Sequence, residues 1–115
     1  MDKRKHKRAL YRCSVSLWRK STPVRFNSFT KDISVSGVRI VLDEELPILQ
    51  DVRLQMDIQD DLPPIVCEAV VKWTLAHRQE GSSTDAPMRY QTGFQFSGLS
   101  DTDRVRLQKI ISQDA

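Results

Sequence analysis

Two arginines near the start of the chain and a short polar turn downstream carry most of the chemistry that the sequence offers. Arg8 and Arg12 are separated by three residues, and Asp32-Ile-Ser-Val-Ser-Gly37 begins twenty residues after Arg12. A planar guanidinium donates bidentately to phosphate oxygens, and equally to O6 and N7 of guanine. The carboxylate of Asp32 can accept from N1–H and N2–H₂ of guanine, a donor pair that no other common base presents. Together they predict a binding site for a phosphorylated, guanine-containing ligand.

The other polar residues of this turn fit the same interpretation. Ser34 and Ser36 can donate to phosphate or carbonyl oxygens, and Gly37 permits a positive φ or the close approach of a ligand to the backbone. Each feature taken alone also has a simpler explanation. A basic cluster can be a solubilising tail or a nonspecific nucleic-acid arm, and Asp-x-Ser followed by Gly makes an ordinary turn between strands.

The positive charge is concentrated at the N-terminus. Six of the first twelve residues are Lys or Arg and one is Asp, so this segment carries about +5, whereas the whole chain carries +3. Residues 13–115 therefore sum to about −2. We expect a flexible basic arm at 1–12, attached to a mildly acidic domain at 13–115. Arg4 and Arg8 have the same spacing as Arg8 and Arg12, so spacing alone leaves the register open.

The domain has the hydrophobic pattern of a small β protein. Apolar residues recur with period two, which is typical of half-buried strands, and turn residues separate the segments. We expect no internal helices, a flexible hairpin tip over 79–87, and a C-terminal helix over about 100–112 that begins with Ser100 and Asp103 as a capping pair. Closure of the sheet removes exposed edges, so the pattern favours a six-stranded antiparallel barrel. The strands are expected at 13–17, 24–33, 38–42, 52–58, 65–75 and 90–96.

Several classes of protein are disfavoured. The 115 residues form one domain, no run approaches the roughly 20 apolar residues of a membrane helix, and no apolar segment follows the basic start as in a secretory signal. We therefore expect a cytoplasmic protein in which Cys13 and Cys67 are buried thiols. His6 and His77 are isolated, so neither a metal nor a cofactor is expected. No catalytic arrangement is visible, and the sequence indicates binding rather than catalysis.

Both motif halves together resemble the PilZ family. The matching residues are Arg8 and Arg12, then Asp32, Ser34 and Gly37. The resemblance extends to three segments and covers nearly the whole chain from Lys7 onward: Gly37-Val-Arg-Ile, Val70-Val-Lys-Trp73, and Gly93-Phe-Gln-Phe-Ser-Gly-Leu-Ser100.

The resemblance implies a cytoplasmic bacterial receptor for cyclic di-GMP, built as a six-stranded antiparallel barrel with a C-terminal helix. By this analogy Arg8 and Arg12 grip phosphates and guanines, Asp32 reads a guanine edge, Ser34 bonds base or phosphate, and Gly37 leaves room. The arm would fold over the ligand and the signal would pass to a protein partner. In the family the second Arg immediately precedes the first strand, which selects Arg12 with Arg8 as its partner. The resemblance thus implies that Arg4 and Lys7 are auxiliary cations.

Some points stay open within this resemblance. Lys7 stands where a further Arg often favours a stacked pair of ligands, so one or two cyclic di-GMP molecules are compatible with the sequence. Trp73 is expected to pack in the barrel, with stacking on the ligand as the alternative role.

Two other functions compete with a cyclic di-GMP receptor. One is a small barrel that binds single-stranded nucleic acid, with Trp18, Phe26 or Phe29 as stacking platforms. This function requires a basic stripe on the barrel, and the net negative domain argues against it, so nucleic acid is not an expected partner. The other is a PilZ-like adaptor without ligand, which the complete motif argues against.

Overall fold

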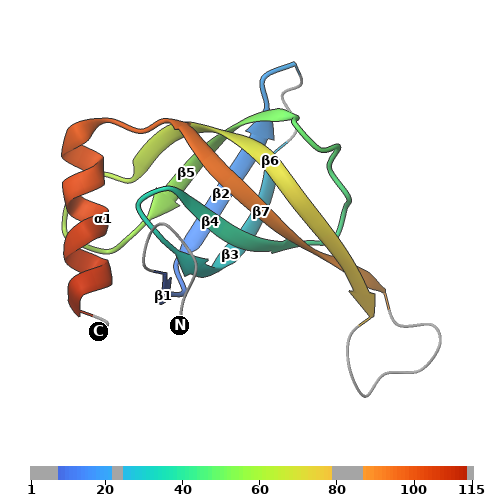
Figure 1. Cartoon of the computed structure of the whole chain (residues 1–115), viewed down its shortest axis with the longest axis horizontal. Helices are drawn as coiled ribbons and strands as arrows, with labels where there is room; N and C mark the ends of the chain where they lie inside the picture. Colours follow the sequence, from blue (N-terminus) through green and yellow to red (C-terminus); the bar gives the residue numbers. More distant parts are fainter. Residues whose placement is uncertain (1–7, 22–24, 79–86, 114–115) are drawn as a thin grey trace.

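The chain forms a closed antiparallel barrel with one helix at its end (Figure 1). The computed structural model describes residues 8–21, 25–78 and 87–113. The strands and the helix of this part are β1 (Ala9–Leu10), β2 (Ser14–Arg19), β3 (Arg25–Ile33), β4 (Gly37–Leu42), β5 (Asp51–Asp57), β6 (Ile65–Arg78), β7 (Met88–Gly98) and α1 (Asp101–Gln113).

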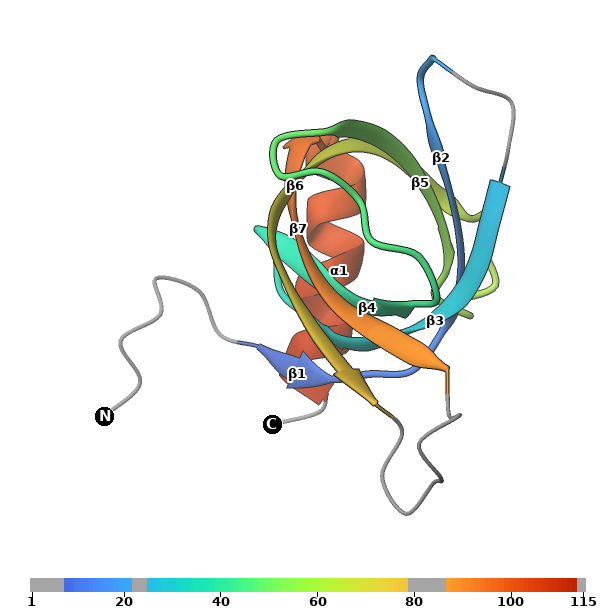
Figure 2. The same ribbon diagram turned by 90° about the vertical axis from the view of Figure 1, so that its right-hand side faces the viewer.

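Six of the strands make the barrel. Their order is β3-β2-β5-β6-β7-β4, and an additional antiparallel pairing between β3 and β4 closes the sheet. Strand β1 lies outside this ring and extends the same edge of β3 that β2 uses further along, as Figure 2 shows. Strands β6 and β7 are the longest and project together beyond the barrel (Figure 1).

Much of the core follows from alternation along the strands, most regularly in β5. In β5, Val52, Leu54 and Met56 are fully buried and their neighbours face outward. The two cysteines, Cys13 and Cys67, also belong to the core as free thiols, which confirms the prediction that they are small buried hydrophobes. Burial raises the pKa of both, that of Cys67 to about 12, so neither described thiol is an activated nucleophile.

Helix α1 packs on one end of the barrel through a single apolar stripe. Leu107, Ile110 and Ile111 are buried, as the sequence predicts. The predicted cap is present, since the Asp103 N–H donates to the Ser100 hydroxyl over 3.1 Å. The Asp103 carboxylate does not complete a capping box, because it accepts a hydrogen bond from Arg106 instead. Among the described residues no helix has the length and apolar character needed to cross a membrane.

The predicted strands are all present, and two boundaries differ in an informative way. Strands β6 and β7 continue past the predicted ends, to Arg78 and back to Met88, because their mutual pairing persists outside the barrel. Within the segment expected to be a flexible arm, Ala9 and Leu10 form a strand that pairs with β3. Residues 1–7, which include Arg4 and Lys7, and loop residues 79–86 lie outside the described part of the chain.

Candidate functional site

One row of residues runs across five strands on the outside of the barrel. The register pairs Trp73 of β6 with Gly93 of β7, Gly93 with Arg39 of β4, Arg39 with Asp32 of β3, and Asp32 with Leu10 of β1. Residues opposite one another in adjacent antiparallel strands have Cβ atoms about 5 Å apart. The row therefore brings an aromatic ring, a guanidinium and a carboxylate together from positions that are far apart in the sequence.

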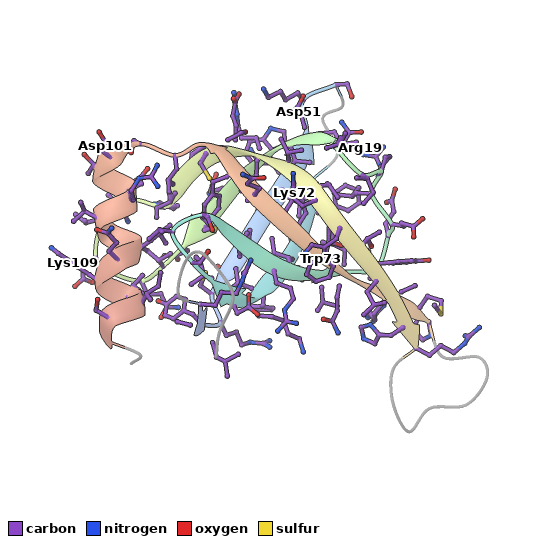
Figure 3. The ribbon with its side chains drawn as sticks, in the orientation of Figure 1. Arg19, Asp51, Lys72, Trp73, Asp101 and Lys109 are labelled. Carbon is purple, nitrogen blue, oxygen red and sulfur yellow. The ribbon has the colours of Figure 1, made fainter. Side chains whose placement is uncertain are left out.

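Two β-bulges direct the side chains of this row. The pairing of β3 with β4 shifts between Thr30 and Asp32, and that of β6 with β7 shifts between Val71 and Trp73. A bulge inserts a residue and re-aims the side chains beside it, and bulges are common next to binding sites. Trp73 is therefore turned outward and is 40% exposed, so the expectation that it packs within the barrel is wrong (Figure 3).

Asp32 lies at the centre of the row between two arginines. Its Oδ1 accepts from Arg8 over 2.8 Å, and its Oδ2 pairs with Arg39 Nη2 at 2.7 Å. The carboxylate is 10% exposed, so solvent screens these pairs less than it screens ion pairs on an open surface. Arg39 is anchored a second time, by donation to Gln91 over 3.3 Å. The orientation of the carboxylate is thus fixed from both sides.

The row opens into two cavities that share Arg8 and Trp73. The first, about 320 Å³, is lined by Arg8, Asp32, Arg39 and Trp73. The second, about 400 Å³, is lined by Arg8, Trp73 and six further residues. Those six are Ser36, Gly37, Lys72, Gly93, Phe94 and Gln95. Together the cavities are lined by cations, by the hydrogen-bond-accepting carboxylate of Asp32 and by the aromatic ring of Trp73. This lining suits a ligand that has phosphates and planar bases.

The turn after β3 is held by the hydroxyl of Ser34. This oxygen accepts from the N–H groups of Ser36 and Gly37, both over 3.1 Å, and the residue is only 1% exposed. The Ser34 side chain therefore closes the turn on itself. Ser36 instead lines the second cavity, so it presents the more accessible of the two hydroxyl groups.

Gly37 is required for packing of the backbone. A Cβ on Gly37 would collide with the carbonyl oxygen of Phe94 on β7. The residue has no positive φ. The sequence suggested a positive φ or the approach of a ligand as the reason for glycine here. The structure shows a different reason, because the group that lies against the Gly37 backbone is the Phe94 carbonyl of the neighbouring strand.

Arg12 is not brought together with Arg8 in this structure. Its guanidinium lies over the ring of Phe29, 4.1 Å from the centroid, in a separate cavity on the outside of β3. The backbone beside it is held in place, because the N–H of Tyr11 donates to Lys31 and the Tyr11 hydroxyl donates to the carbonyl of Ile58. Arg8 and Arg12 thus lie on a tethered segment with their side chains in different cavities.

Sequence reasoning missed Arg39 and Lys72. Arg39 appeared only as part of the segment Gly37-Val-Arg-Ile, and its contact with Asp32 depends on the register across β3 and β4. Lys72 lies at the bulge of β6, which no short pattern announces. In the described part of the chain, no three His, Cys, Asp or Glu side chains are grouped as metal ligands.

A comparison with protein families identifies the domain. The model described as "PilZ domain" matches residues 2–113, which is nearly the whole chain. The chain belongs to the PilZ domain family. None of the curated protein sequences compared with it gives a significant match.

Solved PilZ structures share the fold at low sequence identity. The PilZ domain of YcgR from Escherichia coli, determined with c-di-GMP, is 14% identical with a TM-score of 0.77, covering 98% of this chain and 92% of that one. The Bacillus subtilis inhibitor of motility MotI/DgrA is 15% identical with a TM-score of 0.75, covering 98% and 51%. The MrkH–c-di-GMP complex of K. pneumonia is 19% identical with a TM-score of 0.74, covering 96% and 52%. This PilZ domain thus spans about half the length of the last two chains.

Proposed function

We propose that this PilZ protein is a receptor for cyclic di-GMP and has no catalytic role. The observation that carries the proposal is Asp32, an oriented carboxylate between Arg8 and Arg39 that opens onto a cavity beside Trp73. The structures of the YcgR PilZ domain and MrkH with c-di-GMP support the same ligand class. We further propose that ligand binding is signalled to a protein partner.

We propose an exchange of partners at Asp32 on binding. Arg8 donates to Oδ1 in the free protein, and we expect a guanine N–H to take its place there. We expect Arg8 to move to a phosphate, while Arg39 keeps its contact with Oδ2. A carboxylate has about four lone-pair sites, so Oδ2 can accept from Arg39 and from guanine at once. The exchange replaces one charged contact with another and keeps Asp32 ionised and oriented.

The remaining residues of the motif take complementary roles in this proposal. Trp73 and Arg12 stack on guanines, Ser36 donates to a phosphate, and Lys72 supplies charge in the second cavity. Ser34 and Gly37 set the shape of the turn. Arg12 must leave Phe29 to reach the ligand, and this movement, together with Arg4 and Lys7, would order the arm over the bound nucleotide.

Calorimetric titration of the full chain tests the proposal. Cyclic di-GMP is expected to bind. Cyclic di-AMP is expected to bind at least tenfold more weakly, a difference of about 1.4 kcal/mol in binding free energy, because adenine lacks the N1–H and N2–H₂ donors for Asp32. An absence of cyclic di-GMP binding at about 100 μM, or equal binding of the two dinucleotides, would contradict the proposal.

Arg12 provides the sharpest single substitution. Arg12→Ala is expected to abolish cyclic di-GMP binding and to leave the thermal midpoint of the free protein nearly unchanged, because its described contact is one exposed cation–π pair, worth about 0.5–1 kcal/mol. The matched control is Arg25→Ala, since Arg25 lies over Trp18 at 4.3 Å and outside the site. A large loss of stability in Arg12→Ala alone would show that Arg12 is structural.

A further inference from the structure

The outer face of β3 carries aromatic and basic side chains that lie outside the cavities around Asp32. Arg25, Asn27, Phe29 and Lys31 alternate outward along the strand and are all exposed. Arg25 lies over Trp18 of β2, and Arg12 lies over Phe29. We define the aromatic–basic strip as these two pairs together with the two cations beside them. Its residues are Arg12, Trp18, Arg25, Phe29, Lys31 and Arg89.

A cavity of about 390 Å³ lies at one end of the aromatic–basic strip. Arg12, Lys31 and Arg89 line it from three different segments, together with Phe29 and Val41, and no carboxylate is among its described lining residues. Within the described ranges none of these three cations forms an ion pair with Asp or Glu. Cations converging without a counter-charge repel one another, so an anion bound here would relieve the repulsion.

The net negative charge of the domain does not argue against such a site. Several acids are paired away from the strip: Asp60 and Asp103 with Arg106 beside α1, and Glu68 on β6 with Lys20 and Arg53. Asp57 of β5 lies nearer, in register with Phe29 across Ser14 of β2. On β3 itself the acid is Asp32, and its charge is neutralised by Arg8 and Arg39. The strip thus places four cations around the outer face of β3 in a domain that is net negative as a whole.

We propose that the aromatic–basic strip binds single-stranded nucleic acid. Bases stack on aromatic rings and on guanidinium planes, and phosphates pair with the cations between them. Arg25 and Phe29 are four residues apart on an extended strand, so the two stacks are separated by about 13 Å. An acidic peptide would satisfy the cations and leave both stacking surfaces unused, which is why nucleic acid is the better fit. Phe26, in contrast, packs partly buried against the core and is no platform.

The inference is tested by fluorescence anisotropy of the full chain with labelled oligothymidylate of about 12 nucleotides, a length in the range that one small barrel binds. We expect binding whose logarithmic salt dependence between about 50 and 200 mM has a slope near −3, from about four phosphate contacts at −0.7 each. Phe29→Leu and Trp18→Leu are each expected to weaken binding by about tenfold, the loss of one stacked base.

Charge variants separate this site from general attraction. The double variant Lys31→Gln/Arg89→Gln is expected to reduce the salt slope by about 1.4. The control Arg104→Gln/Lys109→Gln removes the same charge from exposed positions of α1, which contributes no residue to the strip (Lys109 is labelled in Figure 3), and should leave the slope nearly unchanged. Thermal midpoints and cyclic di-GMP titration verify that each variant folds.

Three outcomes would overturn the inference. The first is no anisotropy change at about 100 μM protein in low salt. The second is an equal effect of the two double variants on the salt slope. The third is equal binding of a labelled polyglutamate peptide, which would indicate an acidic protein partner. None of these outcomes bears on the receptor proposal, because Lys31, Arg89, Phe29 and Trp18 lie outside the cavities around Asp32.

Discussion

At the scale of single residues, the candidate site depends on a carboxylate held between two guanidiniums. Arg8 and Arg39 differ in what else holds them: Arg39 also donates to Gln91 and lies in the middle of the sheet, whereas Arg8 precedes the two-residue strand β1. Arg8 is therefore the partner that can leave, and Arg39 the partner that positions Asp32 throughout. Because Arg8 and Arg39 pair with different oxygens of Asp32, the departure of Arg8 would leave the carboxylate oriented by Arg39.

This difference predicts the effect of Arg39→Gln. We expect cyclic di-GMP to bind about tenfold or more weakly, because a hydrogen bond to a charged group contributes about 1.5–3 kcal/mol. Calorimetry measures the loss. Arg53→Gln is the matched control, since Arg53 pairs with Glu68 at 3.3 Å on an exposed part of β5 and β6. Equal affinities of the wild type and Arg39→Gln would show that Asp32 is oriented without Arg39.

At the scale of elements, two glycines have different roles. Gly37 allows two strands to pack, whereas Gly93 leaves room for the Trp73 side chain of the candidate site. A Cβ on Gly37 would meet the backbone carbonyl of Phe94, which cannot move without breaking the β4–β7 pairing. A Cβ on Gly93 would meet the indole of Trp73, a half-exposed side chain that can swing away. The two substitutions therefore have different consequences although both add one methyl group.

Gly37→Ala is expected to lower the free energy of unfolding by about 1–3 kcal/mol, the usual cost of overpacking. Gly93→Ala is expected to cost less stability, to shift the Trp73 fluorescence, and to weaken cyclic di-GMP binding. Denaturant titration and emission spectra in a Trp18→Phe background measure both effects. The interpretation fails if Gly93→Ala is the more destabilising of the two.

The attachment of α1 gives a pH-dependent prediction. Arg106 donates to both oxygens of Asp60 over 2.7 Å and to the carbonyl of Pro63, which ties the helix to the β5–β6 connection. The hydrogen bonds from Arg106 hold the pKa of Asp60 below its usual value of 3.8. Because the folded state binds the proton less readily than the unfolded state, this contribution is complete above pH 3.8 and is lost as pH falls through the lower, folded-state pKa.

Asp60→Asn removes that contribution. Its deficit in free energy of unfolding relative to the wild type should be constant near neutral pH and should shrink below about pH 4. Urea titrations at several pH values measure it, with Asp61→Asn as the control, because Asp61 follows Asp60 and no ion pair of the described residues includes it. A deficit that does not change with pH would mean that the pKa of Asp60 is unperturbed.

The elements show how far the sequence predicts the structure. Alternation in segments such as Val52–Ile58 gave the strands, and the Ser100 cap gave the helix start, because these signals are local. The positions of Trp73 and Asp32 were not predictable in this way. Both follow bulges, and a bulge changes which face a side chain takes only once the partner strand is known. The contact of Arg39 with Asp32 likewise depends on register.

At the scale of the whole molecule, Arg12 links the two proposed sites. It lies on Phe29 in the aromatic–basic strip, and it must leave this ring to reach a ligand at Asp32. Arg8 and Arg12 belong to one short segment tied to β3, so a ligand that draws Arg12 away also removes one cation and one stacking surface from the strip. The two ligands would therefore compete for one side chain without overlapping in space.

This competition predicts negative linkage between the two ligands. Saturating cyclic di-GMP is expected to weaken oligothymidylate binding by about five- to tenfold, and the oligonucleotide must weaken cyclic di-GMP binding by the same factor, because coupling free energies are reciprocal. Anisotropy with and without cyclic di-GMP gives the first factor, and calorimetry with and without oligonucleotide gives the second. The double variant Lys31→Gln/Arg89→Gln serves as a control, since it lowers oligonucleotide affinity and leaves Arg12 free to move. Independent binding of both ligands to the wild type would show that they do not share Arg12. Tighter binding of the oligonucleotide in the presence of cyclic di-GMP would also contradict the competition, and would require the arm to add contacts to the strip.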